Sequence, residues 1–94
     1  MLHVTHAHYL KEYVIAVSFN DGRQGEVDLA PILNKGVFQS LQDMALFAQV
    51  HVEPELETVA WPNGLDLAPE FVYFSAFKSD PLLQPQFKSW GYIP

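Results

Sequence analysis

The sequence predicts a small α+β fold, in which a three-stranded antiparallel meander and a later hairpin carry two or three short helices on one face. Three observations lead to this prediction. Apolar and small side chains alternate over residues 14–19, an Asp-Gly turn follows, and a proline twice opens a helix-compatible segment. The 94 residues, 49% of them hydrophobic, have the length and composition of one globular domain.

The first third of the chain contains the expected meander. Its central strand, residues 14–19, lies in the stretch YVIAVSFNDGRQGEV. The dipeptide Asp21-Gly22 can adopt the left-handed backbone of a tight hairpin, so residues 24–29 are expected to return as the partner strand. Residues 4–10 are expected to form the outer strand, joined through a turn at Lys11 and Glu12.

Short helices are expected after the meander. Residues 31–35 form a helical turn, because proline suits the first helical position and Gly36 can end the turn. Residues 38–47 then form either one broken helix or two short ones. Ser40 and Asp43 are the candidate N-caps of this region.

The second half of the chain is expected to contain a second hairpin and a further helix. Strands are expected at residues 50–52 and 57–61, and the turn Pro-Asn-Gly at 62–64 leads into residues 65–67. From residue 69 the stretch PEFVYFSAFK has no strong helix breaker, so we predict a helix there. A strand and a single helical turn are the competing interpretations.

The tetrapeptide Asp-Leu-Ala-Pro occurs twice, in EVDLAPIL and in GLDLAPEF. A repeat protein needs sustained similarity over several copies, and the flanking residues do not align. We interpret both copies as the same strand-to-helix joint. Asp28 lies three residues before Pro31, and Asp66 lies three residues before Pro69, where a carboxylate favours the start of a helical turn. The competing interpretation is a catalytic carboxylate pair, which needs the two side chains within about 5–10 Å.

The charge distribution argues against binding to nucleic acids. Residues 1–74 hold three cations against ten acids, a net charge of −7, whereas residues 75–94 carry +1. Proteins that bind DNA or RNA need a basic patch that neutralises phosphates. A basic protein partner fits this acidic surface better, although an acidic surface that serves solubility alone is the commoner case.

The composition also bears on the cellular compartment. The chain has no cysteine, which excludes disulfides, thiolate zinc sites and cysteine nucleophiles. No apolar run approaches the length of a transmembrane helix, and the first residues lack the basic and apolar regions of a signal peptide. We therefore expect a cytoplasmic protein that does not associate with membranes.

Several motifs occur in a fixed order, namely YVIAVSFNDGRQGEVDLAPIL, GVFQSLQD, LFAQVHVE and TVAWPNGLDLAPEFVY. Together they resemble the domain-of-unknown-function family 2442 over about residues 4–73. The resemblance implies bacterial origin and a small α+β fold, like the N-terminal domain of two-domain proteins whose second half is a helix-turn-helix. It also implies a neighbouring small gene and a toxin–antitoxin relation. The family has no established activity, so the resemblance supplies no catalytic residues.

The residues that match the family motif are interpreted as structural. They are Asp21, Gly22, Asp28, Pro31, Trp61, Gly64, Asp66, Pro69 and Glu70. The family pattern has Ser or Thr before each proline, where this chain has Ala30 and Ala68. Both joints are therefore expected to lack a hydroxyl N-cap, a loss of about 1 kcal/mol. The 21 residues after Tyr73 are too few for a helix-turn-helix, so DNA binding by analogy with two-domain relatives is not expected.

Three histidines near the N-terminus are weak candidates for metal ligands, since imidazole binds zinc, nickel and copper. His6 and His8 share one face of the expected strand, and His3 precedes them. A metal site needs three or four converging ligands, so solvated histidines are the simpler interpretation, and we expect no metal and no other cofactor. The absence of G-x-S-x-G and glycine-rich phosphate loops disfavours serine hydrolases and nucleotide-dependent enzymes.

We expect residues 1–74 to form the α+β domain, and residues 75–94 to form an aromatic, proline-containing extension that packs on it or serves association. Large aromatic side chains dominate binding hot spots, and they also fill small cores. The candidate partner-binding residues are Phe77, Phe87, Trp90 and Tyr92.

The leading functional hypothesis is a non-enzymatic protein-interaction module. Its partner would be a small, basic protein encoded nearby, to which this chain relates as an antitoxin-like or regulatory half, and a homodimer is a further option. The alternative is a small-molecule or metal-binding domain, conceivably an enzyme. That domain would use Trp61, Asp66 and Glu70 in a pocket with converging carboxylates.

Overall fold

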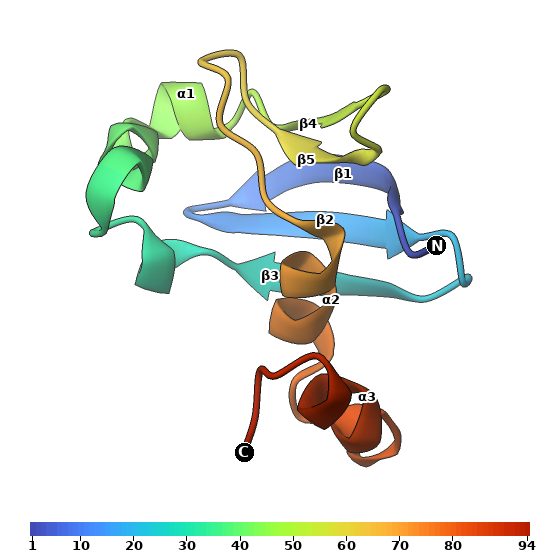
Figure 1. Cartoon of the computed structure of the whole chain (residues 1–94). Coiled ribbons are helices and arrows are strands. Elements are labelled where there is room, and N and C mark those ends of the chain that lie inside the picture. The colour runs from blue at the N-terminus through green and yellow to red at the C-terminus, as the bar shows by residue number, and fades with distance from the viewer.

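A computed structural model describes residues 1–94 and shows a sheet backed by short helices (Figure 1). The strands β1 (Val4–Lys11), β2 (Val14–Phe19) and β3 (Gln24–Asp28) pair antiparallel in the order β1-β2-β3. The predicted meander is therefore confirmed, although β1 extends through Lys11 and β3 ends at Asp28.

The two strand pairs of the meander differ in regularity. Between β2 and β3 the register is continuous from Ser18 opposite Gln24 to Val14 opposite Asp28. Between β1 and β2 the register shifts twice, near each end of β1. The β2–β3 turn contains Gly22 at a φ of 91°, a backbone conformation that glycine adopts without strain.

The second hairpin consists of β4 (His51–Glu53) and β5 (Thr58–Ala60), and it lies beside β1 (Figure 1). The Val4 amide donates a hydrogen bond to the Glu57 carbonyl oxygen at 3.0 Å, which ties the hairpin to the start of β1. After β5 the chain turns and runs antiparallel to the end of this strand, where Asp66 forms a single β-bridge with Ala60. The hairpin thus covers the β1 side of the meander.

Most helical elements are short, as expected. In chain order they are η1 (Ala30–Ile32), η2 (Gly36–Gln42), α1 (Met44–Phe47), α2 (Pro69–Phe77), η3 (Pro81–Leu83) and α3 (Gln84–Ser89), where η denotes a 3₁₀ helix. The predicted helix from Pro69 is confirmed as α2. None of these helices has the length and apolar character needed to cross a bilayer.

The region 38–47 contains two short elements rather than one broken helix. Asp43 separates η2 from α1, and its carboxylate accepts hydrogen bonds from the Ala45 and Leu46 amides at 3.0 and 3.4 Å. Asp43 is therefore the N-cap of α1. Ser40 was wrong as an N-cap, because it lies inside η2 and its hydroxyl donates to the Val37 carbonyl oxygen at 3.0 Å.

The core lies on one face of the meander. Along β2 the side chains of Ile15, Val17 and Phe19 are buried, whereas the alternate side chains are only partly buried. The helix α2 lies across β3 (Figure 1). A Cβ at Gly25 would lie 3.0 Å from the Phe77 ring, so the glycine allows close packing of this helix on the sheet.

The segment 75–94 folds back on α2. Phe87 is completely buried, with ring centroids 5.0 Å from Phe74 and 6.3 Å from Tyr73. The Tyr92 ring stacks on Phe74 at 5.0 Å. The helix α2 itself continues across residue 74 into this segment, so the C-terminal aromatic residues extend the core rather than stand apart from it.

Candidate functional site

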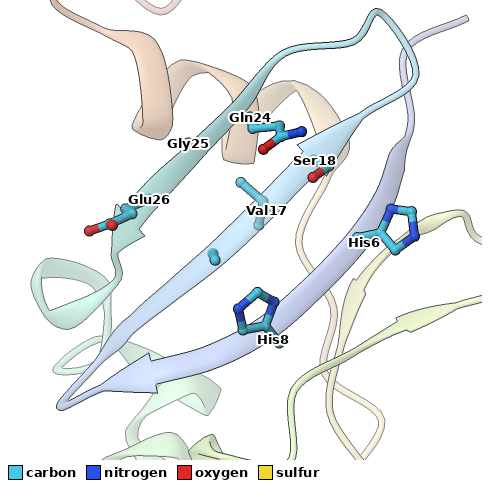
Figure 2. Close-up of a pocket in the computed structure, with 8 residues that line it drawn as sticks. His6, His8, Val17, Ser18, Gln24, Gly25 and Glu26 are labelled. Carbon is cyan, nitrogen blue, oxygen red and sulfur yellow. The ribbon is translucent and has the colours of Figure 1, made fainter.

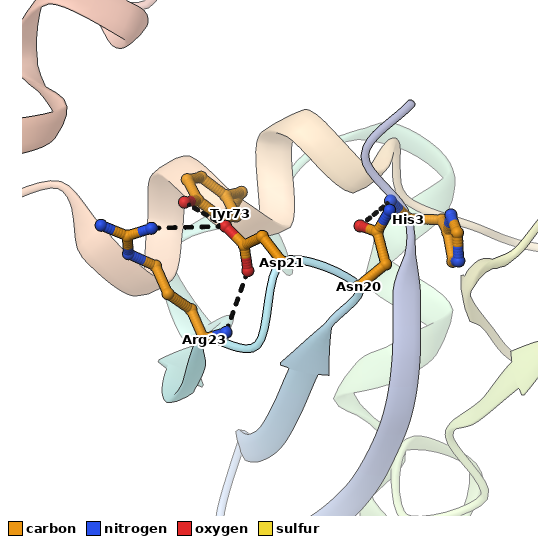
Figure 3. Close-up of polar contacts among 5 residues, drawn as sticks. All are labelled: His3, Asn20, Asp21, Arg23 and Tyr73. Atoms are coloured by element: carbon orange, nitrogen blue, oxygen red, sulfur yellow. Dashed lines mark hydrogen bonds and ion pairs between the residues drawn. The ribbon is translucent and has the colours of Figure 1, made fainter.

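The turn between β2 and β3 is tied to α2 by a network around Asp21 (Figure 3). The Asp21 carboxylate accepts hydrogen bonds from the Tyr73 hydroxyl at 2.7 Å and from the Arg23 amide at 2.9 Å. The Arg23 guanidinium lies 3.5 Å from the same carboxylate. These donors leave Asp21 bound within the fold, so it has a structural role in the turn.

Both ends of this hydrogen bond titrate abnormally. Burial alone would raise the pKa of the Asp21 carboxyl, but the hydrogen bonds from Arg23 and Tyr73 and the Arg23 charge outweigh it, so the pKa is lowered. Burial, and then the Asp21 carboxylate, raise the pKa of Tyr73 to about 12. At neutral pH an ionised carboxylate therefore faces a protonated phenol, which is the arrangement that stabilises their hydrogen bond.

Both Asp-Leu-Ala-Pro joints place a proline in the first turn of a helical element, but the two aspartates have different roles. Asp28 accepts a hydrogen bond from the Ala30 amide at 3.0 Å, and the first joint opens a 3₁₀ helix. The second joint opens α2, and its N-cap residue, Ala68, gives no side-chain hydrogen bond. Neither joint has a side-chain N-cap, as expected, since Leu29 precedes η1 without a side-chain hydrogen bond. The placing of Ala30 at the N-cap position was wrong, because Ala30 is the first residue of η1.

The residues of the small-molecule hypothesis do not converge. Trp61 is only 2% exposed, and its Nε1 donates to the Phe47 carbonyl oxygen at 3.0 Å, so the indole is a core element. Gly64 lies in the following turn, and its amide donates to the Trp61 carbonyl oxygen at 3.0 Å. Asp66 and Glu70 line two different hollows of the surface.

One of these hollows is an apolar groove of about 390 Å³ between the first helical turns and the second joint. Its lining residues are Ile32, Lys35, Phe38, Asp66, Leu67, Ala68 and Phe71. No local pattern indicates this groove, because the two segments that form it, residues 32–38 and 66–71, are far apart in the sequence.

A further hollow, of about 460 Å³, lies on the open face of the meander (Figure 2). His6 and His8 of β1 lie along one side, and Gln24 and Glu26 of β3 lie along the other, with small side chains such as Ser18 between them. His3 lies elsewhere, 3.1 Å from the Glu57 carboxylate. No three His, Asp or Glu side chains of the chain meet in a group that could hold a metal ion.

The four aromatic residues of the C-terminal segment differ in accessibility. Phe87 is buried, Phe77 and Trp90 are half-buried, and Tyr92 is 37% exposed. Burial, and then the nearby Glu70 charge, raise the pKa of Tyr92. A partner can therefore contact Tyr92 and the exposed parts of the Phe77 and Trp90 rings, but not Phe87.

Most carboxylates of the chain have no cationic partner. The sequence holds eleven Asp and Glu residues, but only Asp21 pairs with an arginine and only Glu57 pairs with a histidine. The others include Glu12, Glu26 and Glu55, all of which are exposed. The surface therefore carries a negative field that its own few cations do not neutralise.

The architecture, a meander with a second hairpin and short helices, defines a small α+β class of protein without a recognisable catalytic constellation. The profile of the family described as "Protein of unknown function (DUF2442)" matches residues 4–78. The chain belongs to this family. The comparison with curated proteins gave no match.

A solved structure shares the fold. It is the crystal structure of the "putative DNA binding protein" NE0471 from Nitrosomonas europaea ATCC 19718, with a TM-score of 0.76 and 20% sequence identity. The match covers 100% of this chain and 63% of that chain, so the chain spans less than two thirds of the length of NE0471. At this identity the likeness concerns the fold.

Proposed function

We propose that this chain is a non-enzymatic interaction module that binds a small basic protein. The observation that carries the proposal is the surplus of exposed carboxylates without cationic partners. Such a surface attracts a basic partner from a distance and accelerates productive encounter. The family resemblance adds a product of a neighbouring small gene as the partner, with this chain as the antitoxin-like or regulatory half.

The alternative of a ligand-binding or enzymatic site has weaker support. Its three residues are a buried tryptophan and two carboxylates that line separate hollows. Two of the three groups with shifted pKa values, Asp21 and Tyr73, line a further hollow of about 310 Å³, where they hydrogen-bond to one another at 2.7 Å.

Direct contact with DNA or RNA is not part of this proposal. The description of NE0471 as a "putative DNA binding protein" belongs to that protein, of which this chain matches 63%. The chain here has a net charge of −6, and a polyanion would be repelled by it. Regulation of a protein partner is compatible with this charge, whereas association with a polyanionic phosphate backbone is opposed by it.

Co-purification with the product of the neighbouring small gene tests the proposal. We expect a complex with micromolar or tighter affinity, and an association rate that falls as the salt concentration rises. Failure of the two purified proteins to bind at micromolar concentration would contradict the proposal.

A charge variant makes the test specific. The substitutions Glu12→Gln, Glu55→Gln and Asp66→Asn remove three exposed charges that have no ion-pair partner. We expect slower association with little change in dissociation. The difference from the unmodified chain should vanish at high salt, which serves as the internal control.

A further inference from the structure

The strand β3 forms an edge of the sheet with which no other strand pairs. The Leu29 amide donates to the Tyr13 carbonyl oxygen, and the Phe19 amide donates to the Arg23 carbonyl oxygen, both at 2.9 Å. Hydrogen-bonded pairs alternate with non-hydrogen-bonded pairs along an antiparallel ladder. The backbone N–H and C=O groups of Gly25 and Val27 therefore also point towards β2. The backbone groups of the alternate residues therefore point away from the sheet.

Those outward groups belong to Gln24, Glu26 and Asp28, and none of them bonds to a loop or helix of the chain. The other edge of the meander differs, since β1 has two register shifts and is covered by the hairpin of β4 and β5. Bulges, proline, lysine or a covering segment usually protect an edge strand. The β3 edge has no bulge, proline, lysine or covering segment, and its charged side chains are two carboxylates, Glu26 and Asp28. Its register with β2 is regular over all five residues.

The side chains along this edge disfavour pairing with a second copy of the chain. Gln24, Glu26 and Asp28 are all exposed, and they alternate with less exposed residues. In the antiparallel register that pairs all three outward residues, Glu26 would lie opposite Glu26 of the other copy. Like charges directly opposite one another destabilise a strand pair, whereas opposite charges stabilise it.

On the face of the sheet that α2 covers, the surroundings of the β3 edge are apolar. Gly25 leaves room there for the half-buried side chains of Phe77 and Ala76 from α2. Side chains of an added strand alternate between the two faces of the sheet. Those on the outer face would lie beside Glu26 and Asp28, and those on the inner face would lie beside Phe77.

We infer that the β3 edge accepts an extended segment of a basic partner protein, in which Lys or Arg alternates with apolar residues, as an added antiparallel or parallel strand. Backbone hydrogen bonds supply affinity in this mode of binding, and alternate side chains supply specificity. The inference rests on the proposed function and gives that function its contact surface.

The test uses a short synthetic peptide of alternating lysine and valine as the probe, added to the full chain. Amide hydrogen exchange followed by NMR should show the Glu26 amide exposed in the free protein and protected in the complex. A matched peptide, N-methylated at the amides that would face β3, should bind at least about tenfold more weakly, because it lacks the donors. Equal binding of both peptides, or no binding of the parent peptide, would overturn the inference.

A pair of charge reversals locates the site. The substitution Glu26→Lys should weaken peptide binding by about tenfold, since an attractive cross-strand contact becomes repulsive. The substitution Glu55→Lys changes the net charge equally at an exposed position away from β3, and should have a much smaller effect. Equal losses in both variants would mean attraction by net charge alone and would refute the β3 site.

The same variants separate this inference from the proposed function. If the co-purified partner protein binds the Glu26→Lys variant as well as the unmodified chain, the function stands and the β3 edge is not its surface. If no partner protein binds but the peptide shows protection at Glu26, the edge accepts strands and the proposed function fails.

Discussion

At the scale of single residues, one hydrogen bond joins two distant parts of the chain. Tyr73 and Asp21 are 52 positions apart, and their side chains meet at 2.7 Å. The bond fixes the β2–β3 turn against α2, and thereby sets where β3 lies relative to the helix that covers it. We assign a stabilising role to both residues, because their hydrogen bond ties the turn to the helix.

The substitution Tyr73→Phe should lower the free energy of unfolding by about 1–2 kcal/mol at neutral pH, the value of a hydrogen bond to a charged group near the surface. Urea denaturation measures this loss. Tyr9→Phe is the control, because the Tyr9 ring keeps its edge contact with Phe47 and its hydroxyl has no bond to lose.

The stability of Tyr73→Phe should also depend less on pH than that of the unmodified chain at alkaline pH. The pKa of Tyr73 rises from 10.0 to about 12 in the folded chain, so its contribution to stability is complete below pH 10. That contribution is lost as the pH rises from 10 towards 12. The unmodified chain should therefore lose more stability than Tyr73→Phe over this window, and parallel curves would contradict the assignment.

At the scale of elements, the two joints reach similar turns by different means. The first satisfies the Ala30 amide with the Asp28 carboxylate, whereas the second leaves the start of α2 without a side-chain cap. The shared proline explains why the tetrapeptide recurs, because proline is tolerated in the first turn of both elements, as the second residue of η1 and the first of α2. What differs is the backbone path between the aspartate and the proline.

This difference predicts unequal effects of one substitution at two sites. Ala68→Ser places a hydroxyl at the N-cap of α2, and should stabilise the chain by about 0.5–1.5 kcal/mol. Ala30→Ser lies inside η1, next to an amide that is already bonded, and should have little effect. Thermal or urea denaturation of both variants measures the contrast, and equal stabilisation would contradict it.

At the scale of the whole molecule, the C-terminal segment completes the core. Phe87 lies among rings of α2 and is fully buried, so its removal opens a cavity in a small core. Phe87→Ala should lower the free energy of unfolding by about 3–5 kcal/mol. Leu82→Ala, in the same segment but 81% exposed, should change it by less than about 0.5 kcal/mol. Similar values for both would show that the segment does not pack on α2.

The parts of the fold that sequence could predict are those with local causes. The alternation along β2, the turn at Gly22 and the proline before α2 each act within a few residues, and all three elements formed as predicted. The Asp21–Tyr73 bond and the groove beside Asp66 depend on segments that only folding brings together. Ser40 and Asp43 are both residue types that favour an N-cap, so the local sequence does not distinguish between them. The structure does, because α1 begins directly after Asp43, whereas Ser40 lies inside η2.

The close approach of Phe77 to Gly25 has an evolutionary consequence. Even a Cβ atom at position 25 would lie 3.0 Å from the Phe77 ring, so the side chains at positions 25 and 77 compete for the same space. In relatives that keep this helix on this strand, we expect a larger residue at position 25 only where position 77 has become smaller. Positions 25 and 77 would then covary in an alignment of these relatives, as expected for two residues in contact.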